Sequence, residues 1–439
     1  MSELNRIPVS EASPAAASPA ASAAAQALAR QLLPKVLRDR VRSVLQELLR
    51  VPSPQTDLLE AEPQLREFIR TAMVPRMAGL GFTRVRQDAL GNMIAERGPA
   101  DAKRSLMLVM HAMNQPPSTM PDPYGAVVID GRPHGMPGEA VLGKGASEQK
   151  GTLAAVIHAI EAVRDSGVAL DGRLVLLCLV SGETGNPLAI SHVVEKEGVR
   201  ADLAYVYGNA MQLQLGNRGR VDVTATVNGA PSHSSRPNEG ANAIVGAMEF
   251  LRRLAVEIPN THSHPGLGTA WLTCNGIESF PKSTHTVQGT CVVKLDQRLL
   301  PGDDPQAAVA RIEAVARSMD DWPDPISGKP FRVVVEAGAY MYPSLVTEDS
   351  LPARLLQAGC TAMLEREVGT FYGQSAHDQG YLNHVGIPTA NFGPGEQSFA
   401  HTDLDLASVD KVHDAAKVYA WLIAGYLGRD PAFGADPVQ

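Results

Sequence analysis

The sequence predicts an α/β protein with a mainly parallel sheet that helices cover on both faces, and with a βαββαβ unit inserted into it. Short, nearly continuous apolar runs occur in the first and last parts of the chain, which is typical of strands buried on both faces. Helical patterns alternate with these runs, as a parallel sheet requires. In the middle of the chain, apolar and polar residues alternate instead, which indicates half-exposed strands of a second sheet.

The outer parts of the chain supply the main sheet and its helices. Apolar residues recur at helical spacing over 33–48 and again over 151–163, so both segments should be helices. A further helix is expected from near Glu60 to Met73, ending before Pro75 because proline interrupts helices. The expected buried strands are 105–110, 173–181, 201–208 and 386–393.

The middle of the chain has the order of a split βαβ unit, a ferredoxin-like arrangement. Its expected elements are a strand at 221–229, a helix at 242–254, strands at 269–277 and 289–300, a helix at 305–317 and a strand at 331–337. We therefore assign 219–337 to an inserted domain, and 31–218 with 338–439 to the α/β domain. Residues 1–30 are rich in Ala, Ser and Pro and should form a disordered tail.

Composition restricts the partners of the protein. The net charge of −8 argues against nucleic acid or an anionic membrane surface, since both need a basic face. No apolar stretch reaches membrane-spanning length, and the N-terminal segment lacks the pattern of a signal peptide. The four cysteines show no CxxC spacing, which favours a reducing cytoplasm. A small molecule in a cytoplasmic protein is the expected ligand.

Polar residues follow the predicted buried strands, at the edge where open α/β sheets bind ligands. A fifth polar residue, Glu148, lies just before the helix at 151–163. Imidazole and carboxylate groups together suit zinc, manganese or cobalt. The four residues that follow strands are His111, Glu183, Asn209 and His401.

The segments around these residues carry specific motifs. Five of them are HAM at 111–113, GKGASEQKG at 143–151, GETG at 182–185, YGNA at 207–210 and GPGEQSFAHTDLD at 393–405, and two more are GAPSHSSRPNEGANAI at 229–244 and SAHDQGYLNHVGIPT at 375–389. Together they resemble the two-domain metallopeptidases and amidohydrolases that include glutamate carboxypeptidase, succinyl-diaminopimelate desuccinylase, aminoacylase and allantoate amidohydrolase. The resemblance covers nearly the whole chain after the N-terminal tail.

The resemblance implies that the inserted domain is a lid and a dimerisation domain. The protein should then be a homodimer or a higher homo-oligomer. His233 lies in the motif at 229–244, and the resemblance places it near the active site of the partner subunit. Closure of such a lid would exclude water from the site.

The chain departs from the family pattern at the residues that carry the chemistry. His111, Glu183 and His401 are kept. The departures are Met113 in place of an Asp, Glu148 in place of the Asp that bridges two metals, Gly182 in place of the general-base Glu, and Asn209 in place of an acidic ligand.

These departures change the expected metal content. The family's first metal would be held by His111, Glu148 and Asn209, and an amide oxygen is a weaker donor than a carboxylate. Met113 cannot orient a histidine ligand by a hydrogen bond, which weakens the same site further. The other set, Glu148, Glu183 and His401, is intact in chemical type. We expect one divalent metal per chain (Mn, Zn or Co), with His111 as a further ligand, and the first family site empty or weak.

The departures also change the expected reaction. Gly182 removes the carboxylate that would carry a proton to the leaving amine, so the chain should be a poor peptidase. By motif position, the residues that could replace this base are His377, His233 and Glu396. Metal-bound hydroxide can attack without a strong base if the substrate is itself activated. One relative of the family acts on such a substrate: 5-nitroanthranilate aminohydrolase replaces a ring amine by hydroxyl and releases ammonia.

The leading hypothesis is therefore a metal-dependent hydrolase of a C–N bond in a small carboxylate-bearing substrate, and specifically an aromatic aminohydrolase of this kind. The first alternative is a deacylase of N-acyl amino acids with a substitute base. Arginine suits carboxylate binding, and the candidate substrate-binding residues are Asn209, Arg236, Asn275 and Arg298. The second alternative is a non-catalytic binding or scaffold protein on the same fold.

Overall fold

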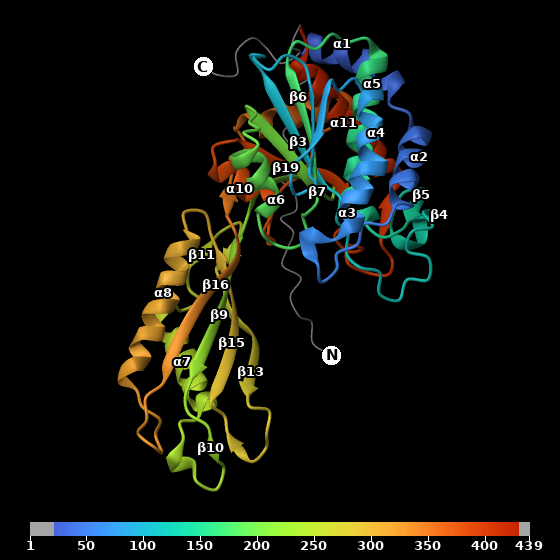
Figure 1. Cartoon of the computed structure of the whole chain (residues 1–439). Helices are drawn as coiled ribbons and strands as arrows, with labels where there is room; N and C mark the ends of the chain where they lie inside the picture. The colour runs from blue at the N-terminus through green and yellow to red at the C-terminus, as the bar shows by residue number, and fades with distance from the viewer. Residues whose placement is uncertain (1–21, 430–439) are drawn as a thin grey trace.

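The computed structural model describes residues 22–429, which form two bodies joined by extended strands (Figure 1). The larger body is built on a nine-stranded sheet, and the smaller one on a four-stranded sheet. The small body is formed by one continuous stretch from the middle of the chain, and the larger one by the segments on either side of it. This arrangement confirms the predicted fold class.

The large sheet is parallel at its centre and mixed at its edges. β3 pairs in parallel with β6 on one side and with β7 on the other, and β7 pairs in parallel with β19. The strand order is β1 (Arg84–Gln87), β2 (Met93–Arg97), β6 (Arg173–Leu179), β3 (Ser105–His111), β7 (Leu203–Asn209), β19 (Thr389–Gly395), β8 (Leu213–Asn217) and β17 (Ser344–Leu345), with β18 (Thr370–Gly373) also paired to β8. The apolar runs that predicted buried strands are β3, β6, β7 and β19.

Helices enclose this sheet because its central strands are apolar on both faces. α5 (Gly151–Ser166) packs against α11 (Val409–Leu427), and α2 (Arg38–Leu49) and α9 (Leu351–Leu364) add to the same layer. The short helices α6 (Leu188–Ser191) and α10 (Asp378–His384) contact each other on the other side of the sheet (Figure 1). α5 and α11 are buried over most of their length, and they include the fully buried Trp421.

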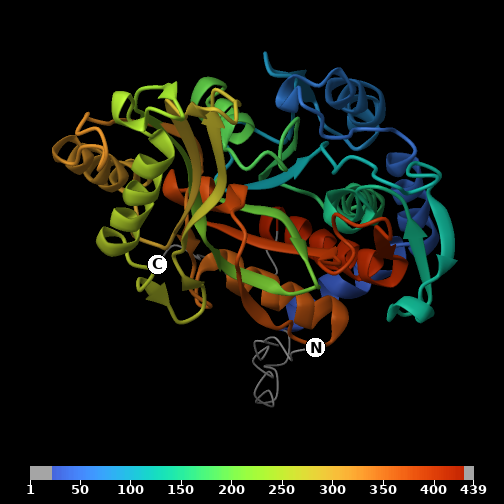
Figure 2. The ribbon, with the colours of Figure 1, turned by 90° about the horizontal axis from the view of Figure 1, so that it is seen from below.

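The small body is the predicted βαββαβ unit. Its sheet has the order β13 (Leu272–Phe280), β15 (Thr290–Leu299), β9 (Gly219–Asn228) and β16 (Arg332–Met341), all antiparallel. The helices α7 (Ala243–Glu257) and α8 (Pro305–Ser318) cover one face. Figure 2 shows this domain standing beside the large sheet. β9 alternates between buried and half-exposed residues, and its valines pack with Phe250 and Ile312 under the helices.

Two helical expectations need correction. α1 spans Ala23–Leu32 and buries Ala25, Ala29 and Leu32, so the end of the expected disordered tail is a packed helix. The rest of that tail, 1–21, lies outside the described residues. The helix expected to end before Pro75 continues instead, through α3 (Pro63–Phe68), a wider turn at Ile69–Met73 and α4 (Val74–Gly79). Pro75 lies in the first turn of α4, where a proline needs no N–H donor.

The loop-rich segment after β3 contains part of a third, smaller sheet. β4 (Val127–Asp130) pairs with β5 (Glu139–Leu142), and β5 pairs with β20 (Leu406–Ser408) from the far end of the chain. Leu406 lies opposite Leu142, so this pairing brings residues just after 400 beside those just after 142. Both of these stretches carry predicted site residues.

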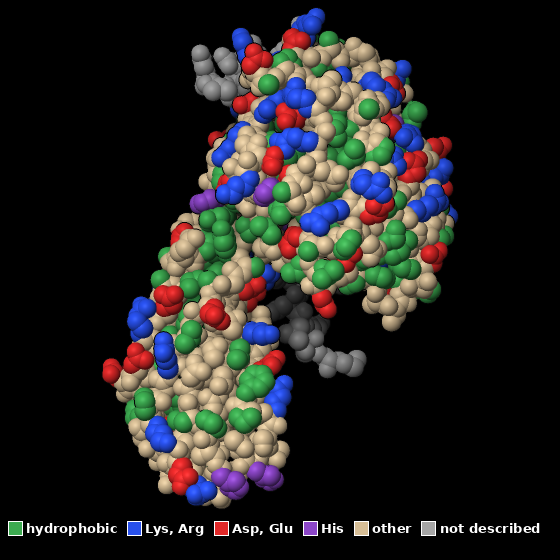
Figure 3. All heavy atoms as spheres, in the orientation of Figure 1, with side chains coloured by type: hydrophobic (Ala, Val, Ile, Leu, Met, Phe, Trp, Pro, Cys, Tyr) green, Lys and Arg blue, Asp and Glu red, His purple; other side chains and the backbone are tan. Residues whose placement is uncertain are grey.

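The surface agrees with the composition. On the face shown in Figure 3, acidic and basic side chains are interspersed over both domains, so this face offers no continuous basic surface. Within residues 22–429, no helix combines the length and apolar character needed to span a membrane.

Candidate metal centre

The parallel strands gather the predicted ligands at one edge of the large sheet. His111 is the last residue of β3, Glu183 follows β6, and His401 follows β19. These strands and β7 are neighbours and run in the same direction, so their carboxyl ends meet. Glu148 reaches the same place from a short helical turn, Ala146–Lys150, just before α5.

The four predicted ligands lie close together. One ligand atom each from Glu148, Glu183 and His401 lies within 4.8 Å of the other two. The Nε2 atom of His401 is 3.1 Å from Oε1 of Glu148 and 3.5 Å from Oε2 of Glu183. The Nε2 atom of His111 is 3.6 Å from Oε1 of Glu183. His401 is 58% exposed at its side chain, so the cluster is open to solvent on this side.

The electrostatics of the cluster fit a bound cation. Burial, together with the charges of Glu183 and Asp405, raises the pKa of Glu148 to about 8. Burial opposes ionisation of Glu183 as well, but hydrogen bonding to His401 and Gln115 and the charge of His111 hold its pKa below the ordinary value. Two carboxylates this close disfavour each other's charge unless a cation lies between them.

An unpaired nitrogen of His111 also favours a bound metal. His111 is fully buried, and its Nε2 atom has no hydrogen-bond partner among the described residues. A buried polar atom without a partner is costly, and a metal ion would satisfy it. The nearby buried cation, Lys150, is engaged elsewhere: its Nζ atom donates to the carbonyl of Val51 at 2.9 Å and lies over the ring of Phe68. Two carboxylates and two imidazoles form a donor set that suits zinc, manganese or cobalt.

A buried carboxylate, Asp405, holds the turn that carries Glu148. Its Oδ1 atom accepts hydrogen bonds from the backbone N–H and the hydroxyl of Ser147, both at 2.7 Å, and Oδ2 accepts from the N–H of Gly145 at 2.6 Å. Lys144 donates to the carbonyl of Thr402 at 2.8 Å. The loop of His401 and the turn of Glu148 are therefore tied together as one unit.

The ring of His111 leaves no space for a side chain at position 182, where the chain has a glycine. A Cβ atom added at residue 182 would lie 2.1 Å from Cδ2 and 2.3 Å from Cγ of the His111 ring. The ring therefore occupies the space that any side chain at this position would need. The same ring meets the ring of Tyr207 edge-on at 4.4 Å. With the ring in this position, residue 182 cannot be the glutamate that acts as general base in the family that the sequence resembles.

Met113 and Asn209 each have another role in the structure. Met113 is fully buried in the core of the large domain, so it packs there as an apolar side chain. The Nδ2 atom of Asn209 donates to Oε1 of Gln397 at 2.9 Å.

The three candidate replacements for the base lie in different places. His377 is half-buried beside Tyr207, with ring centroids 6.2 Å apart, and burial lowers its pKa to about 4. Glu396 forms an ion pair with Lys411 at 2.6 Å. His233 is exposed in the inserted domain, where its Nδ1 atom lies 2.7 Å from the hydroxyl of Ser235. Of these three candidates, His377 is the one whose pKa the charges of Glu183 and His111 affect.

The expected substrate-binding residues of the inserted domain lie outside the ligand cluster. Arg236 is exposed, with Nη1 3.3 Å from Oε1 of Glu239. Asn275 is exposed at a bulge in β13. Arg298 is paired to Asp296, with its Nε atom 3.0 Å from Oδ1.

Sequence reasoning assigned no role to several residues that shape the site. Asp405 lies in the quoted motif at 393–405, and its contacts with the 143–151 motif become visible only in the fold. Gln115 donates from Nε2 to Oε2 of Glu183 at 3.1 Å, and no motif marked it. Asp378 is buried with its Oδ2 atom unpaired among the described residues, and burial followed by the charge of Glu183 raises its pKa to about 7.

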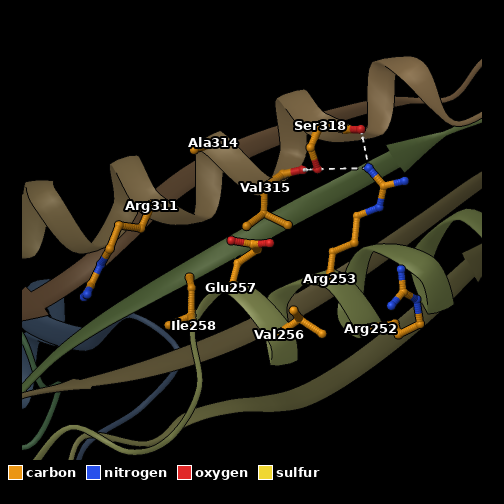
Figure 4. A pocket seen from close by; sticks show the side chains of 9 residues that line it. All are labelled: Arg252, Arg253, Val256, Glu257, Ile258, Arg311, Ala314, Val315 and Ser318. Carbon is orange, nitrogen blue, oxygen red and sulfur yellow. Dashed lines mark hydrogen bonds between the residues drawn. The ribbon is translucent and has the colours of Figure 1, made fainter.

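A cavity of about 590 Å³ between α7 and α8 is separate from this cluster (Figure 4). It lies on the helical side of the inserted domain and contains none of the candidate site residues. Arg253 crosses it to donate to the carbonyl and the hydroxyl of Ser318, which ties the two helices together.

A substitution at Gly182 tests the contact with His111. Gly182→Ala should displace the buried ring and destabilise the metal-free protein by about 1–3 kcal/mol, the usual cost of overpacking. It should also weaken metal binding if the ring is a ligand, as the sequence predicts. The measurements are thermal unfolding of the chelated protein and metal titration.

The matched control for that substitution is Gly79→Ala. Gly79 is the last residue of α4, and an added Cβ there meets nothing within 4 Å. It should leave metal affinity unchanged and stabilise the protein slightly, by about 0.4–1 kcal/mol, because alanine reduces the entropy of the unfolded chain. Equal behaviour of the two variants would mean that the His111 ring does not occupy the space beside Gly182.

Comparison with known proteins agrees with this architecture. Residues 215–322 match the M20 peptidase dimerisation domain. The Escherichia coli K12 protein YgeY is 23% identical over 88% of this chain and 94% of its own length. N-formyl-4-amino-5-aminomethyl-2-methylpyrimidine deformylase from Bacillus subtilis is 21% identical over 66% and 72%.

Among solved structures, the M20 metallo-carboxypeptidase Sso-CP2 from Sulfolobus solfataricus superposes with a TM-score of 0.69 and 18% identity, over 88% of this chain and 99% of that one. That structural likeness concerns the fold alone. The chain is therefore similar to the M20 peptidases in its dimerisation domain at 215–322, and to the two relatives above over most of its length at 21–23% identity.

Proposed function

We propose that the protein is a metal-dependent hydrolase that cleaves a C–N bond, an amide bond in the first instance, in a small carboxylate-bearing molecule. The observation that carries this proposal is the convergence of Glu148, Glu183 and His401 within 4.8 Å, with His111 beside them. A relative supports it, since the Bacillus subtilis protein is by name a deformylase.

We propose one tightly held divalent metal per chain, on Glu148, Glu183, His401 and His111. Such an ion acts as a Lewis acid that polarises a carbonyl and lowers the pKa of water. A second ion of the family type would need Asn209 as a ligand, and the amide of Asn209 is engaged with Gln397. The second site therefore has a neutral amide in place of a carboxylate donor at that position.

Metal content tests this assignment. Protein loaded with manganese or zinc and then dialysed should retain one equivalent per chain by elemental analysis. A chelator should remove it together with activity. Two tightly held equivalents would refute the single-ion arrangement, and no tight metal at all would favour a binding or scaffold protein.

Amide cleavage requires a proton for the leaving amine, and we propose that His377 supplies it in place of the missing carboxylate. Its lowered pKa keeps the imidazole neutral near pH 7, so the ring is able to accept a proton from water in the site. Its contact with Tyr207, which also touches His111, places it beside the ligand cluster.

A second candidate activity follows from the contact between Gly182 and His111. With no room for a base at 182, the site favours a substrate whose carbon is already electron-poor. An aromatic ring that bears an amine and a nitro group, as in 5-nitroanthranilate, is such a substrate, and the reaction would release ammonia. This activity would not depend on His377.

The two activities are distinguished by one panel. Manganese-loaded protein is given N-formyl and N-acetyl amino acids beside 5-nitroanthranilate, with a chelator control. We expect acyl cleavage that falls by about 10²–10⁴-fold in kcat in His377→Gln, because a positioned acid–base group contributes that much. The exposed His285→Ala should behave as the unaltered protein. Ammonia release without acyl cleavage would establish the aminohydrolase instead.

We also propose that the protein is a homodimer through its inserted domain. β13 is an edge strand that pairs only with β15 in its sheet, and its Ile277 is 54% exposed. Ile277 and Ile244 of α7 line one surface cavity of about 550 Å³, and Met248 on the same helix is 66% exposed. An open strand edge beside exposed apolar side chains is suited to pairing with another chain. His233 would then lie near the site of the partner subunit.

Light scattering tests the dimer. The protein should have about twice the chain mass of 46.7 kDa, and Ile277→Glu should shift it to the monomer by placing a charge in the interface. Leu58→Glu, at a 58% exposed leucine of the large domain, should leave the mass unchanged. A monomer in the unaltered protein would contradict this assembly.

A further inference from the structure

We propose that Glu60 is a positioning residue for the metal centre, because its carboxylate holds the loop that presents Glu183. This inference rests on the proposed metal-dependent function and adds to it a residue outside all of the site motifs. Glu60 lies in a short helical turn, Leu59–Ala61, far from Glu183 along the chain. It does not touch the predicted ligands, so it acts through the loop.

One carboxylate oxygen of Glu60 accepts hydrogen bonds from three side chains of the loop at 181–187. Its Oε1 atom accepts a hydrogen bond from the hydroxyl of Thr184 at 2.6 Å, from Nδ2 of Asn186 at 2.9 Å and from the hydroxyl of Ser181 at 3.0 Å. The hydroxyls of Ser181 and Thr184 are also 2.7 Å apart. Gly182 and Glu183 lie between these donors in the sequence.

The loop needs such an anchor because its own backbone is weakly constrained. Residues 181–187 form neither helix nor strand. Gly182 has no side chain to pack, and Gly185 has a φ of +67°, a conformation that glycine adopts readily. The carboxylate of Glu183 nevertheless lies 3.5 Å from Nε2 of His401 and 3.6 Å from Nε2 of His111, and a shared metal ion requires this position to be kept. A fixed carboxylate that binds three side chains at once limits the freedom of the whole segment.

The charge of Glu60 suits this role. Burial alone would raise its pKa, but the hydrogen bonds from Thr184, Asn186 and Ser181 together hold the pKa below the ordinary value. The group is therefore an ionised, acceptor-only carboxylate near neutral pH. Hydrogen bonds to an ionised acceptor are about twice as strong as those between neutral groups.

The inserted domain contacts the same loop from another direction. Nη2 of Arg220, in β9, donates to the carbonyl of Gly185 at 3.3 Å and to Oδ2 of Asp222 at 2.9 Å. A Cβ atom at Gly185 would lie 2.6 Å from that nitrogen, so the approach is close. Glu60 therefore fixes the loop to the large domain, while Arg220 links it to the small one.

The experiment compares metal affinity and steady-state kinetics in Glu60→Ala, Glu60→Gln and Glu62→Ala. Calorimetric titration of the unaltered protein with Mn²⁺ or Zn²⁺ comes first, because failure of that protein to bind metal would refute the proposed function. Given binding, Glu60→Ala should weaken metal affinity by about 10–100-fold, as loss of groups that orient ligands does. Glu60→Gln keeps one acceptor oxygen, so its metal affinity should lie between that of the unaltered protein and that of Glu60→Ala.

Glu62→Ala is the matched control, since Glu62 caps α3 by accepting from the N–H of Gln64 and does not touch the loop. It should change stability without changing metal affinity. In a double-mutant cycle, Thr184→Val should add little to the affinity loss in Glu60→Ala, because both act through one contact. Metal affinity of Glu60→Ala and Glu60→Gln within twofold of the unaltered protein would overturn the proposal.

Discussion

The site depends on one electrostatic constraint, which is that two carboxylates, Glu148 and Glu183, are held together in a largely buried position. Burial and then the charge of Glu183 raise the pKa of Glu148 to about 8, so a cation is needed for both carboxylates to be ionised at neutral pH. The buried amine of Lys150 does not pair with these carboxylates, since its Nζ atom donates to the carbonyl of Val51. The surrounding fold thus preserves an arrangement that is unfavourable in itself, and an ion that both carboxylates bind would make it favourable.

The fold opposes this repulsion with contacts between distant parts of the chain. The parallel strands bring His111 and Glu183 to one edge, but Glu148 and His401 depend on loops. The pairing of β20 with β5 places these loops side by side, and Asp405 then binds the turn of Glu148 through three hydrogen bonds. His401 itself adopts a φ of +62°, a conformation that a residue other than glycine seldom takes unless its surroundings enforce it.

The features that could be predicted from the sequence are those that a local pattern of residues determines. Apolar runs identified the four central strands, alternation identified the inserted sheet, and ends of strands identified the ligand positions, so the fold class and the cluster of His111, Glu148, Glu183 and His401 followed. The continuation of the helix through Pro75 was missed, because a wider turn before it moves the proline to the start of a new helix. The contacts of Asp405, Gln115 and Glu60 could not be predicted from the sequence, because each joins segments that only the tertiary fold brings together.

The departure at Gly182 is explained by the packing of the His111 ring. A histidine ligand is usually oriented by a hydrogen bond from its second nitrogen to a carboxylate. Here the residue two places on is a buried methionine, and the ring is held by the edge-on contact with Tyr207 and by the flat surface that Gly182 offers. A glutamate at 182 and the present position of the ring exclude each other sterically. The position of the imidazole therefore accounts for the loss of the usual base, and a side chain restored at 182 would displace the His111 ring.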